Sequence, residues 1–198
     1  MKIIISLLVF LYSSIGFTQS ADSVLKSLQN KFDSIADLTA DVAQKSNGKS
    51  ILSGKMYFKK DNNLRIEFGN QTIVADGKTS WNYNKKNNKV VISDYDEAGS
   101  GLLSINYLVY QYPSACDLSL SSKGSVQILN LKPKSKKNSF GEVKLFINKD
   151  NLIDKIVISN QAAGTMELSF SNYKLNQNLS DSKFSFTEPE GTTVVDLR

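Results

Sequence analysis

The stretch Ile73-Val-Ala-Asp-Gly-Lys-Thr-Ser-Trp-Asn-Tyr83 indicates two short strands joined at Asp76-Gly77. Asp-Gly between two apolar runs favours a tight hairpin whose two central residues both have positive φ. Because side chains alternate along a strand, Trp81 and Tyr83 share one face, and the polar residues beside them share the other. The stretch therefore predicts a hairpin with one aromatic face and one polar face, as in a half-buried sheet.

Another strand, turn and strand precede this hairpin, over Gly54-Lys-Met-Tyr-Phe-Lys-Lys-Asp-Asn-Asn-Leu-Arg-Ile-Glu-Phe68. Alternation again puts the apolar residues of each strand on one face. A curved sheet built from such strands, with a helix inside or across it, offers a concave apolar surface. The residues expected to line this hydrophobic cavity are Met56, Phe58, Leu64, Ile66, Phe68, Trp81 and Tyr83.

The order of these pieces resembles the LolA family, the periplasmic carriers that take lipoproteins from the inner to the outer membrane of Gram-negative bacteria. The order is Gly-x-Met-x-Phe-Lys-Lys, a turn, Leu-Arg-Ile-Glu-Phe, a gap, then Ile-Val-x-Asp-Gly-Lys-x-x-Trp-x-Tyr. The segment from Phe184 to Asp196 is similar to the family's closing segment: Phe-x-Phe, a Pro-x-Gly turn, and a short apolar strand ending in Asp. The resemblance covers nearly the whole chain after residue 20.

The resemblance implies a mostly β (α+β) fold, with a single large curved antiparallel sheet that forms an unclosed β-barrel. An N-terminal helix and short lid helices would lie over a hydrophobic cavity that takes lipoprotein acyl chains. The implied partner is an inner-membrane lipoprotein-releasing transporter, with an outer-membrane receptor left open. Lys60 stands where the family often has an arginine that resembles a latch to the lid. Lys60 and Arg65 are therefore expected to form that latch, although lysine lacks the planar fork of arginine.

The periodicity of the chain agrees with this fold. An amphipathic helix is indicated just after residue 20 by apolar residues at helical spacing from Val24 to Ile35, with Asp22 as a possible cap. From Leu38 the period becomes two, which indicates strands. Turns rich in Asn, Gly and Lys separate the later strands, which are expected at about 51–60, 64–68, 71–76, 79–83, 89–93, 117–121, 125–131, 141–148, 152–159, 164–173 and 183–187.

Residues 94–113 interrupt the strand pattern with a short, strongly apolar segment that Pro113 ends. A helix this apolar cannot lie alone on a surface, so it must plug or cover something. In the LolA family, helices at this position form part of a lid. The residues expected to form the lid here are Leu102, Leu103, Ile105, Leu108 and Val109.

Residues 1–20 have the pattern of a secretory signal peptide, with Lys2, an apolar run over 3–10, and the small-x-small site Thr18-Gln-Ser20. The remaining residues 21–198 form one domain without internal repeats. The only cysteine, Cys116, lies far from the leader's end, so no lipid anchor is expected there and Cys116 is expected to be a packed residue. The sequence therefore predicts an exported, soluble, monomeric protein of the periplasm.

The composition argues against several functional classes. The chain has no histidine, which excludes Ser-His-Asp and Cys-His nucleophiles and leaves no zinc-type ligand set. Neither a catalytic centre nor a metal or cofactor is therefore expected. Without Lys2, the balance of 23 basic and 19 acidic residues is mildly basic. The basic run over 132–138 fits a solvated loop or a contact with an acidic partner or lipid head groups, whereas nucleic acid is not expected.

Three functions are compatible with these features. The first is a lipoprotein carrier. The second is a carrier, on the same fold, of another amphiphile such as a glycolipid or a pigment ester. The third is a non-carrier envelope interaction protein whose barrel is filled by side chains, and the presence of a cavity separates this one from the first two.

Overall fold

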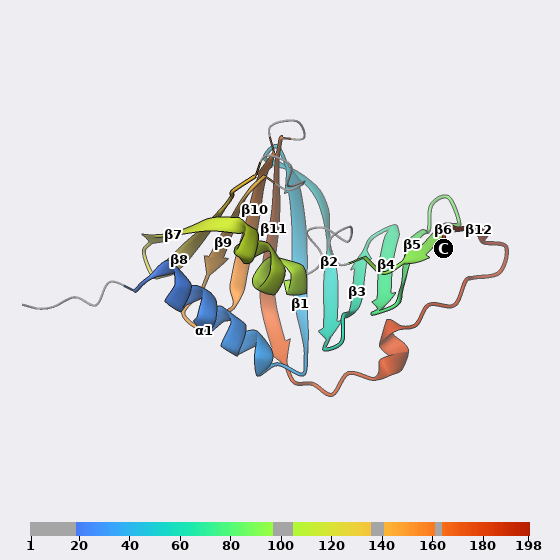
Figure 1. The fold of residues 1–198 in the computed structure, drawn as a ribbon. Helices are drawn as coiled ribbons and strands as arrows, with labels where there is room; N and C mark the ends of the chain where they lie inside the picture. Colours follow the sequence, from blue (N-terminus) through green and yellow to red (C-terminus); the bar gives the residue numbers. More distant parts are fainter. Residues whose placement is uncertain (1–18, 97–104, 136–140, 161–163) are drawn as a thin grey trace, which may run out of the picture.

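The computed structural model describes residues 19–96, 105–135, 141–160 and 164–198. A twelve-stranded sheet in the order β12-β6-β5-β4-β3-β2-β1-β11-β10-β9-β8-β7 forms most of it. Neighbouring strands run antiparallel, except that β12 runs parallel to β6 (Figure 1). The strands are β1 (Asp37–Ser46), β2 (Lys49–Lys59), β3 (Asn63–Phe68), β4 (Gln71–Asp76), β5 (Thr79–Asn84), β6 (Lys89–Asp94), β7 (Cys116–Lys123), β8 (Val126–Pro133), β9 (Glu142–Ile147), β10 (Ile153–Asn160), β11 (Gly164–Leu175) and β12 (Thr193–Asp196).

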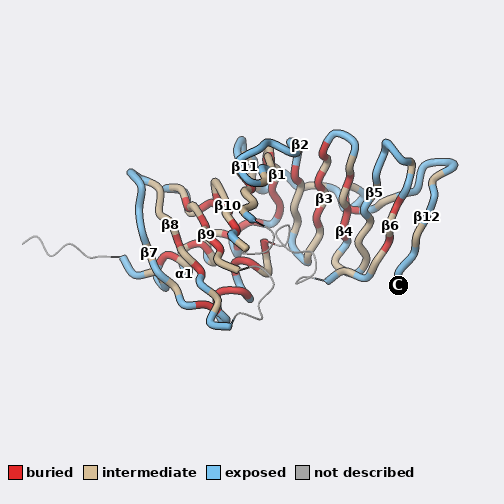
Figure 2. The backbone as a smooth tube through the Cα atoms, turned by 90° about the horizontal axis from the view of Figure 1, so that it is seen from above, coloured by how far each residue is buried: buried red, intermediate tan, exposed pale blue. Residues whose placement is uncertain are grey.

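The sheet curves but does not close on itself. Its order begins at β12 and ends at β7, so these two strands are its edges. Viewed from above, the strands follow an open arc with α1 (Ala21–Asp33) on its inner side (Figure 2). This confirms the predicted single, unclosed sheet, with β12 as the one parallel addition. We call the face toward α1 the inner face and the opposite face the outer face.

Helix α1 starts where the sequence predicted a helix, but its cap is a different residue. The hydroxyl of Ser20 accepts a hydrogen bond from the backbone N–H of Ser23 at 3.1 Å, so Ser20 takes the capping role expected of Asp22. Val24, Leu28 and Phe32 are buried along one stripe of the helix. These side chains join the core over the inner face, and α1 contacts β7 and β8.

The main core lies between this helix and the inner face of the sheet. Paired residues of an antiparallel ladder share a face, so the register identifies the inner set directly. One row runs through Ala40, Met56 and Ile66, which are all buried. The same face continues into the second half of the sheet through Val42, Phe170, Leu168, Ile156, Leu145, Leu129, Val143 and Leu131.

A second, smaller cluster lies on the outer face and is covered by the end of the chain. We call residues 176–198 the C-terminal strap. Phe184, in the short 3-10 helix η4 (Asp181–Phe184), is 2% exposed, and Val74 and Val90 of the outer face are both 0% exposed. Helix η4 contacts β3 and β4. The sequence predicted a strand over 183–187, which is wrong, because η4 occupies its start and the chain after it runs without a ladder partner to β12.

The strap is attached to the rest of the sheet by the buried carboxylate of Asp37, which is 2% exposed. Its two oxygens accept hydrogen bonds from the backbone N–H groups of Gln177 and Leu179, at 2.7 and 3.1 Å. A carboxylate that accepts backbone donors in this way offsets the cost of its own burial. Asp37 therefore fixes the point at which the chain leaves β11 for the outer face.

The hairpin predicted at Asp76-Gly77 is present, but only one of the two residues has a positive φ. Gly77 has φ +84°, and a Cβ there would lie 2.4 Å from the carbonyl oxygen of Asp61, so glycine is required. The central residues of the turn are Gly77 and Lys78 rather than Asp76 and Gly77, since Ala75 pairs with Ser80. Asp76 instead accepts hydrogen bonds from the two backbone N–H groups that follow the glycine, at 2.9 and 2.8 Å.

Candidate functional site

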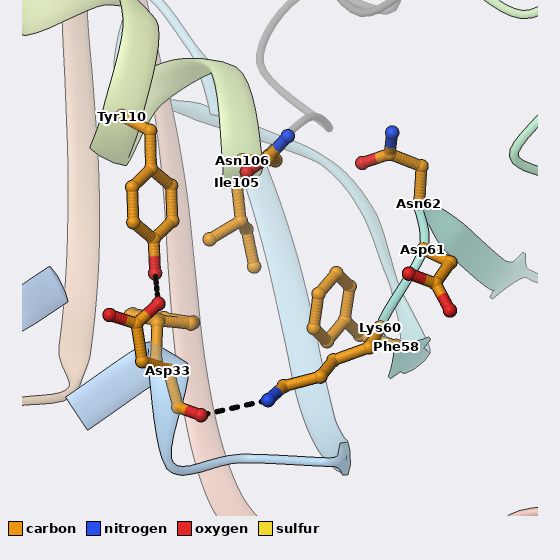
Figure 3. Close-up of a pocket in the computed structure, with 9 residues that line it drawn as sticks. Asp33, Phe58, Lys60, Asp61, Asn62, Ile105, Asn106 and Tyr110 are labelled. Atoms are coloured by element: carbon orange, nitrogen blue, oxygen red, sulfur yellow. Dashed lines mark hydrogen bonds between the residues drawn. The ribbon is translucent and has the colours of Figure 1, made fainter. Parts of the chain in front are cut away.

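A partly open cleft of about 370 Å³ lies where the end of α1, the end of β2 and the segment after residue 104 meet. Figure 3 shows side chains from all three regions around it. The volume is at the lower end of the range of about 300–1,000 Å³ typical of ligand pockets. The cleft is lined by Phe32, Asp33, Phe58, Lys60, Asp61, Asn62, Ile105, Asn106 and Tyr110.

One wall of the cleft belongs to the predicted lid. This wall consists of Ile105, Asn106 and Tyr110. After residue 106 the chain forms the π-helical turn η2 (Tyr107–Gln111) and the 3-10 helix η3 (Tyr112–Ala115). Ile105, Leu108 and Val109 are buried and belong to the main core. The other two predicted lid residues, Leu102 and Leu103, lie outside the described residues. A π-helical turn is a rare local form that often marks a functional position.

Three hydrogen-bond contacts join η2 to α1, and one of them is a 3.2 Å contact from the Tyr110 hydroxyl to the carbonyl of Gln29. The Tyr110 hydroxyl donates to Oδ1 of Asp33 at 2.6 Å, and Nε2 of Gln29 donates to the carbonyl of Val109 at 3.1 Å (Figure 3 shows the first). Burial, and next the Asp33 carboxylate, raise the pKa of Tyr110 well above its ordinary value of 10.0. The hydroxyl therefore keeps its proton and remains a donor at physiological pH. These bonds, with the buried apolar residues of η2, hold η2 against α1.

Lys60 lies at the cleft as expected, but it binds the helix rather than the lid. Its Nζ donates to the backbone carbonyl of Asp33 at 2.8 Å (Figure 3). The last carbonyls of a helix lack partners inside it and carry partial negative charge, so a lysine is favourable there. Asp33 thus accepts a hydrogen bond from Tyr110 of η2 through its carboxylate, and one from Lys60 through its backbone carbonyl. The predicted latch is replaced by a junction centred on the end of α1.

Arg65, the second predicted latch residue, lies on the outer face. Its Nε forms an ion pair with Oε1 of Glu67 at 2.6 Å, and Nη1 donates to the backbone carbonyl of Lys183 at 3.3 Å. Burial raises the pKa of Glu67, but the hydrogen bond from Arg65 and the charge of Lys183 outweigh it, so the net pKa lies below the ordinary 4.5. Arg65 therefore attaches the C-terminal strap and does not reach the cleft.

The register also divides the seven residues predicted to line the cavity. Five lie on the inner face, and of these only Phe58 borders the cleft, while the other four are buried in the core next to it: Met56, Leu64, Ile66 and Phe68. Trp81 and Tyr83 lie on the outer face, because Trp81 pairs with Val74 and Tyr83 with Thr72. Tyr83 contacts the ring of Phe186 in the strap, with centroids 5.4 Å apart. Their expected place in the cavity is thus corrected.

Several residues of the cleft were not expected from the sequence. Phe32 was expected only as a helix residue, and Asp33 and Tyr110 had no assigned role. Asp33 could have been noticed, since it is the last charged residue before the helical period ends. Tyr110 could not, because its partner is 77 positions away and only the tertiary fold brings the two together.

The chemistry of the cleft is that of a binding site. Its lining combines the apolar side chains of Phe32, Phe58 and Ile105 with the charged side chains of Asp33, Lys60 and Asp61. In the described parts of the chain, no three His, Cys, Asp or Glu side chains are grouped so as to hold a metal ion. Cys116 is buried in the core, and burial raises the pKa of its thiol, which disfavours the reactive thiolate.

The helices that the structure describes are all too short or too polar to cross a membrane.

Comparison with known proteins gives consistent matches. The family model for "Outer membrane lipoprotein carrier protein LolA" matches residues 33–187. An outer-membrane lipoprotein carrier protein of Legionella pneumophila (strain Lens) is 27% identical over 198 residues, which is 96% of each chain. One from Histophilus somni (strain 2336) is 30% identical over 186 residues, covering 89% of each. Among solved structures, an uncharacterized conserved protein from Thermus thermophilus matches 89% of this chain and 98% of its own, with TM-score 0.60 and 20% identity, which shows a shared fold.

Proposed function

Since this chain belongs to the LolA family of outer membrane lipoprotein carrier proteins, we propose that it is a soluble periplasmic carrier. It binds the acyl chains of lipoproteins and takes them from the inner to the outer membrane. The observation that carries the proposal, beside family membership, is the cleft between α1, η2 and the inner face of β2. Next to Phe58 in this cleft, the inner faces of β2 and β3 carry buried apolar side chains that a movement of residues 105–111 would expose.

Acyl chains suit such a surface because they have no hydrogen-bonding groups that the protein would have to pair. Their binding depends on buried area, and each methylene removed from water contributes about 0.8 kcal/mol. The inner faces of β2 and β3 supply Met56, Phe58, Leu64, Ile66 and Phe68. These five residues are the proposed acyl contacts, with Phe58 at the entrance.

The lid segment gives the carrier a means of release. The cleft is small for a lipid, and the neighbouring apolar surface is occupied by Ile105, Leu108 and Val109. Cargo can take their place only if η2 moves away from α1, which breaks the Tyr110–Asp33 hydrogen bond. Packing of the lid therefore competes with cargo and limits its affinity, so that bound lipid can be handed on. No step in this cycle needs a catalytic group.

The remaining parts of the proposal concern export and partners. Residues 1–20 act as a signal peptide, and the mature chain works as a monomer without a lipid anchor. An inner-membrane lipoprotein-releasing transporter loads it, and an outer-membrane receptor is one way in which it would be unloaded.

The test is to purify the protein from its own periplasm and identify bound lipid by mass spectrometry, beside the Phe58→Glu variant prepared in the same way. Wild-type protein should carry acylated peptides, and the variant should carry much less. Glycolipid or a pigment ester in place of acylated peptides would favour the second carrier function. A preparation that lacks any lipid, and accepts none from a detergent-solubilised lipoprotein, would overturn the proposal.

A further inference from the structure

The inner face of the sheet changes from apolar to polar between β4 and β5. One row of paired residues runs Leu38, Phe58, Leu64, Ala75, Ser80 and Ser93, from β1 to β6. The next row runs Ala40, Met56, Ile66, Ile73, Asn82 and Val91. In both rows the residues from β1 to β4 are apolar, and the β5 residue is the first polar one. The apolar inner surface therefore ends between β4 and β5 in these two rows, and one strand earlier, at Gln71 of β4, in the row of Phe68.

At and beyond that line, hydroxyl and carboxamide groups form a set that we call the polar inner patch: Gln71, Ser80, Asn82 and Ser93. The hydroxyls of Ser80 and Ser93 are 2.9 Å apart. Nε2 of Gln71 donates to Oδ1 of Asn82, also at 2.9 Å. The amide nitrogen of Asn82, an exposed residue, donates to no other group within the described ranges. The patch thus has donors and acceptors left for a ligand, and none of its members is charged.

The patch is not simply the solvent side of an ordinary amphipathic sheet. The apolar residues of β5 and β6 lie mainly on the outer face: Trp81 and Tyr83 of β5 are half-buried there, and Val90 and Ile92 of β6 are buried. The C-terminal strap covers this cluster through the contact of Phe186 with Tyr83. The main apolar face of β5 and β6 is therefore the outer one, whereas the apolar face of β1–β3 is the inner one. The strap covers the apolar outer face of β5 and β6, so the inner face of these strands does not need apolar side chains. That polar inner face adjoins the apolar inner surface of the neighbouring strands.

We propose that the polar inner patch binds the first peptide groups of the lipoprotein, next to the acyl chains that lie against β2 and β3. This inference rests on the proposed carrier function and adds a second, polar subsite to it. Neighbouring strands are about 4.8 Å apart, so a ligand that crosses from β4 to β6 extends over roughly 10 Å. An amphiphile laid along the rows meets apolar side chains at one end and hydrogen-bonding side chains at the other.

The chemistry of the patch selects peptide over an anionic head group. Serine hydroxyls and carboxamides both donate and accept, which matches the N–H and C=O groups of a peptide backbone. A phosphate would be better held by Arg or Lys, through charge-assisted hydrogen bonds. The lysine that β5 and β6 place on this face, Lys89, pairs with Asn84 at the other end of the strands from Ser80 and Ser93. The four uncharged members of the patch therefore match the first peptide groups of an acylated polypeptide, whose acyl chains fit the apolar half of the inner face.

The test compares two probes that carry the same alkyl chain: a neutral tripeptide amide with an N-terminal palmitoyl group, and hexadecanol. The wild-type protein should bind the palmitoyl peptide about twofold to tenfold more tightly than hexadecanol, the gain that a neutral hydrogen bond contributes. The variant with Ser80→Val and Asn82→Leu should lose this preference and keep its affinity for hexadecanol. Ser53→Val is the matched control, since Ser53 is exposed on the outer face of β2.

The outcomes separate this inference from the function on which it rests. A peptide preference that is unchanged in the double variant, with hexadecanol still bound, would overturn the inference alone. A wild-type protein that binds neither probe would overturn the carrier function and the inference together. If the double variant does not fold, Asn82→Ala removes the exposed carboxamide with little change in shape, and it should lower the preference by at least about twofold.

Discussion

Phe58 and Trp81 are aromatic residues on neighbouring parts of one sheet, but they lie on opposite faces. Phe58 pairs with Leu64 and borders the cleft, whereas Trp81 pairs with Val74 beneath the C-terminal strap. We expect Phe58→Glu to lower the affinity for a fluorescent hydrophobic probe by about tenfold or more, because it places a charge against the apolar surface. Titration of the probe with purified protein measures this.

Trp81→Glu is the matched variant for that experiment. It should leave probe affinity within about twofold of the wild type and instead lower the urea midpoint, since its charge would disturb the outer-face cluster. If Trp81→Glu lowered probe binding as much as Phe58→Glu in a folded protein, the division of the two faces would be contradicted.

Glu67 makes the attachment of the strap sensitive to acid. Burial raises its pKa, but the Arg65 hydrogen bond and the Lys183 charge outweigh burial, so the pKa in the folded protein lies below 4.5. The unfolded chain therefore takes up the proton first as the pH falls. The stability from this site is complete above the unfolded pKa and is lost as the pH falls through the folded one. We expect the urea midpoint to fall between about pH 5 and pH 3, and to fall less in Glu67→Gln.

The exposed Glu190 provides the control for this pH dependence. Glu190→Gln should keep the pH profile of the wild type. Equal profiles for Glu67→Gln and the wild type would show that the ion pair with Arg65 does not contribute to acid sensitivity.

At the scale of elements, the contact between η2 and α1 sets how easily the cleft opens. Tyr110→Phe removes the hydrogen bond to Asp33 and the longer contact with the Gln29 carbonyl, and leaves the ring in place. A loss of about 1 kcal/mol from the closed state should raise the apparent affinity for a hydrophobic probe by about fivefold, since probe and lid compete for the same surface. Fluorescence titration at constant pH measures the change.

Tyr83→Phe is a suitable control, because the Tyr83 hydroxyl donates to Asn88 on the other side of the sheet, at 2.9 Å. It should leave probe affinity unchanged. If Tyr110→Phe also had no effect, or lowered the affinity, lid packing would not compete with the probe.

The elements themselves were largely accessible from the sequence. Alternation and turn residues predicted the strands from β1 to β11, and helical spacing predicted α1, because each pattern is local. Alternation also showed that Trp81 and Tyr83 share a face, but it could not say which face is inner. That depends on the register between β4 and β5 and on the strap, whose contacts join residues more than a hundred positions apart.

The parallel pairing of β12 was beyond the sequence for a related reason. Val194 and Val195 have the composition of a strand, but nothing local specifies β6 as the partner or the direction of pairing. The same holds for η4, where Phe184 and Phe186 alternate as in a strand. Burial of Phe184 against the outer face was decided by the fold, not by the local period.

At the scale of the whole molecule, one sheet carries two packed clusters on opposite faces. Phe184 is the buried side chain that joins the strap to the outer cluster, with 2% of its surface exposed. We expect Phe184→Ala to lower the free energy of unfolding by about 3 kcal/mol, as for other buried aromatic residues. Hydrogen exchange should become faster at the amides of β5 and β6, and should change little in β9 and β10, whose core lies on the inner face.

Phe186 gives a graded comparison, since it is half-buried and its ring lies against that of Tyr83. Phe186→Ala should produce the same pattern with a smaller effect. Uniform acceleration of exchange in all strands of Phe184→Ala would mean that the two clusters unfold as a single unit.

The position of β1 has a consequence for how the chain folds. This strand lies in the middle of the sheet, with β2 on one side and β11 on the other. The ribosome makes β1 early, but the edge of β1 that pairs with β11 stays unpaired until Leu175 has been made and can pair with Leu38. Closing so long a loop is slow, and an unpaired central strand is a template for association with other chains. We therefore expect folding to be slow and prone to aggregation until the β10–β11 hairpin is in place, and the refolding yield to rise on dilution or with holding chaperones.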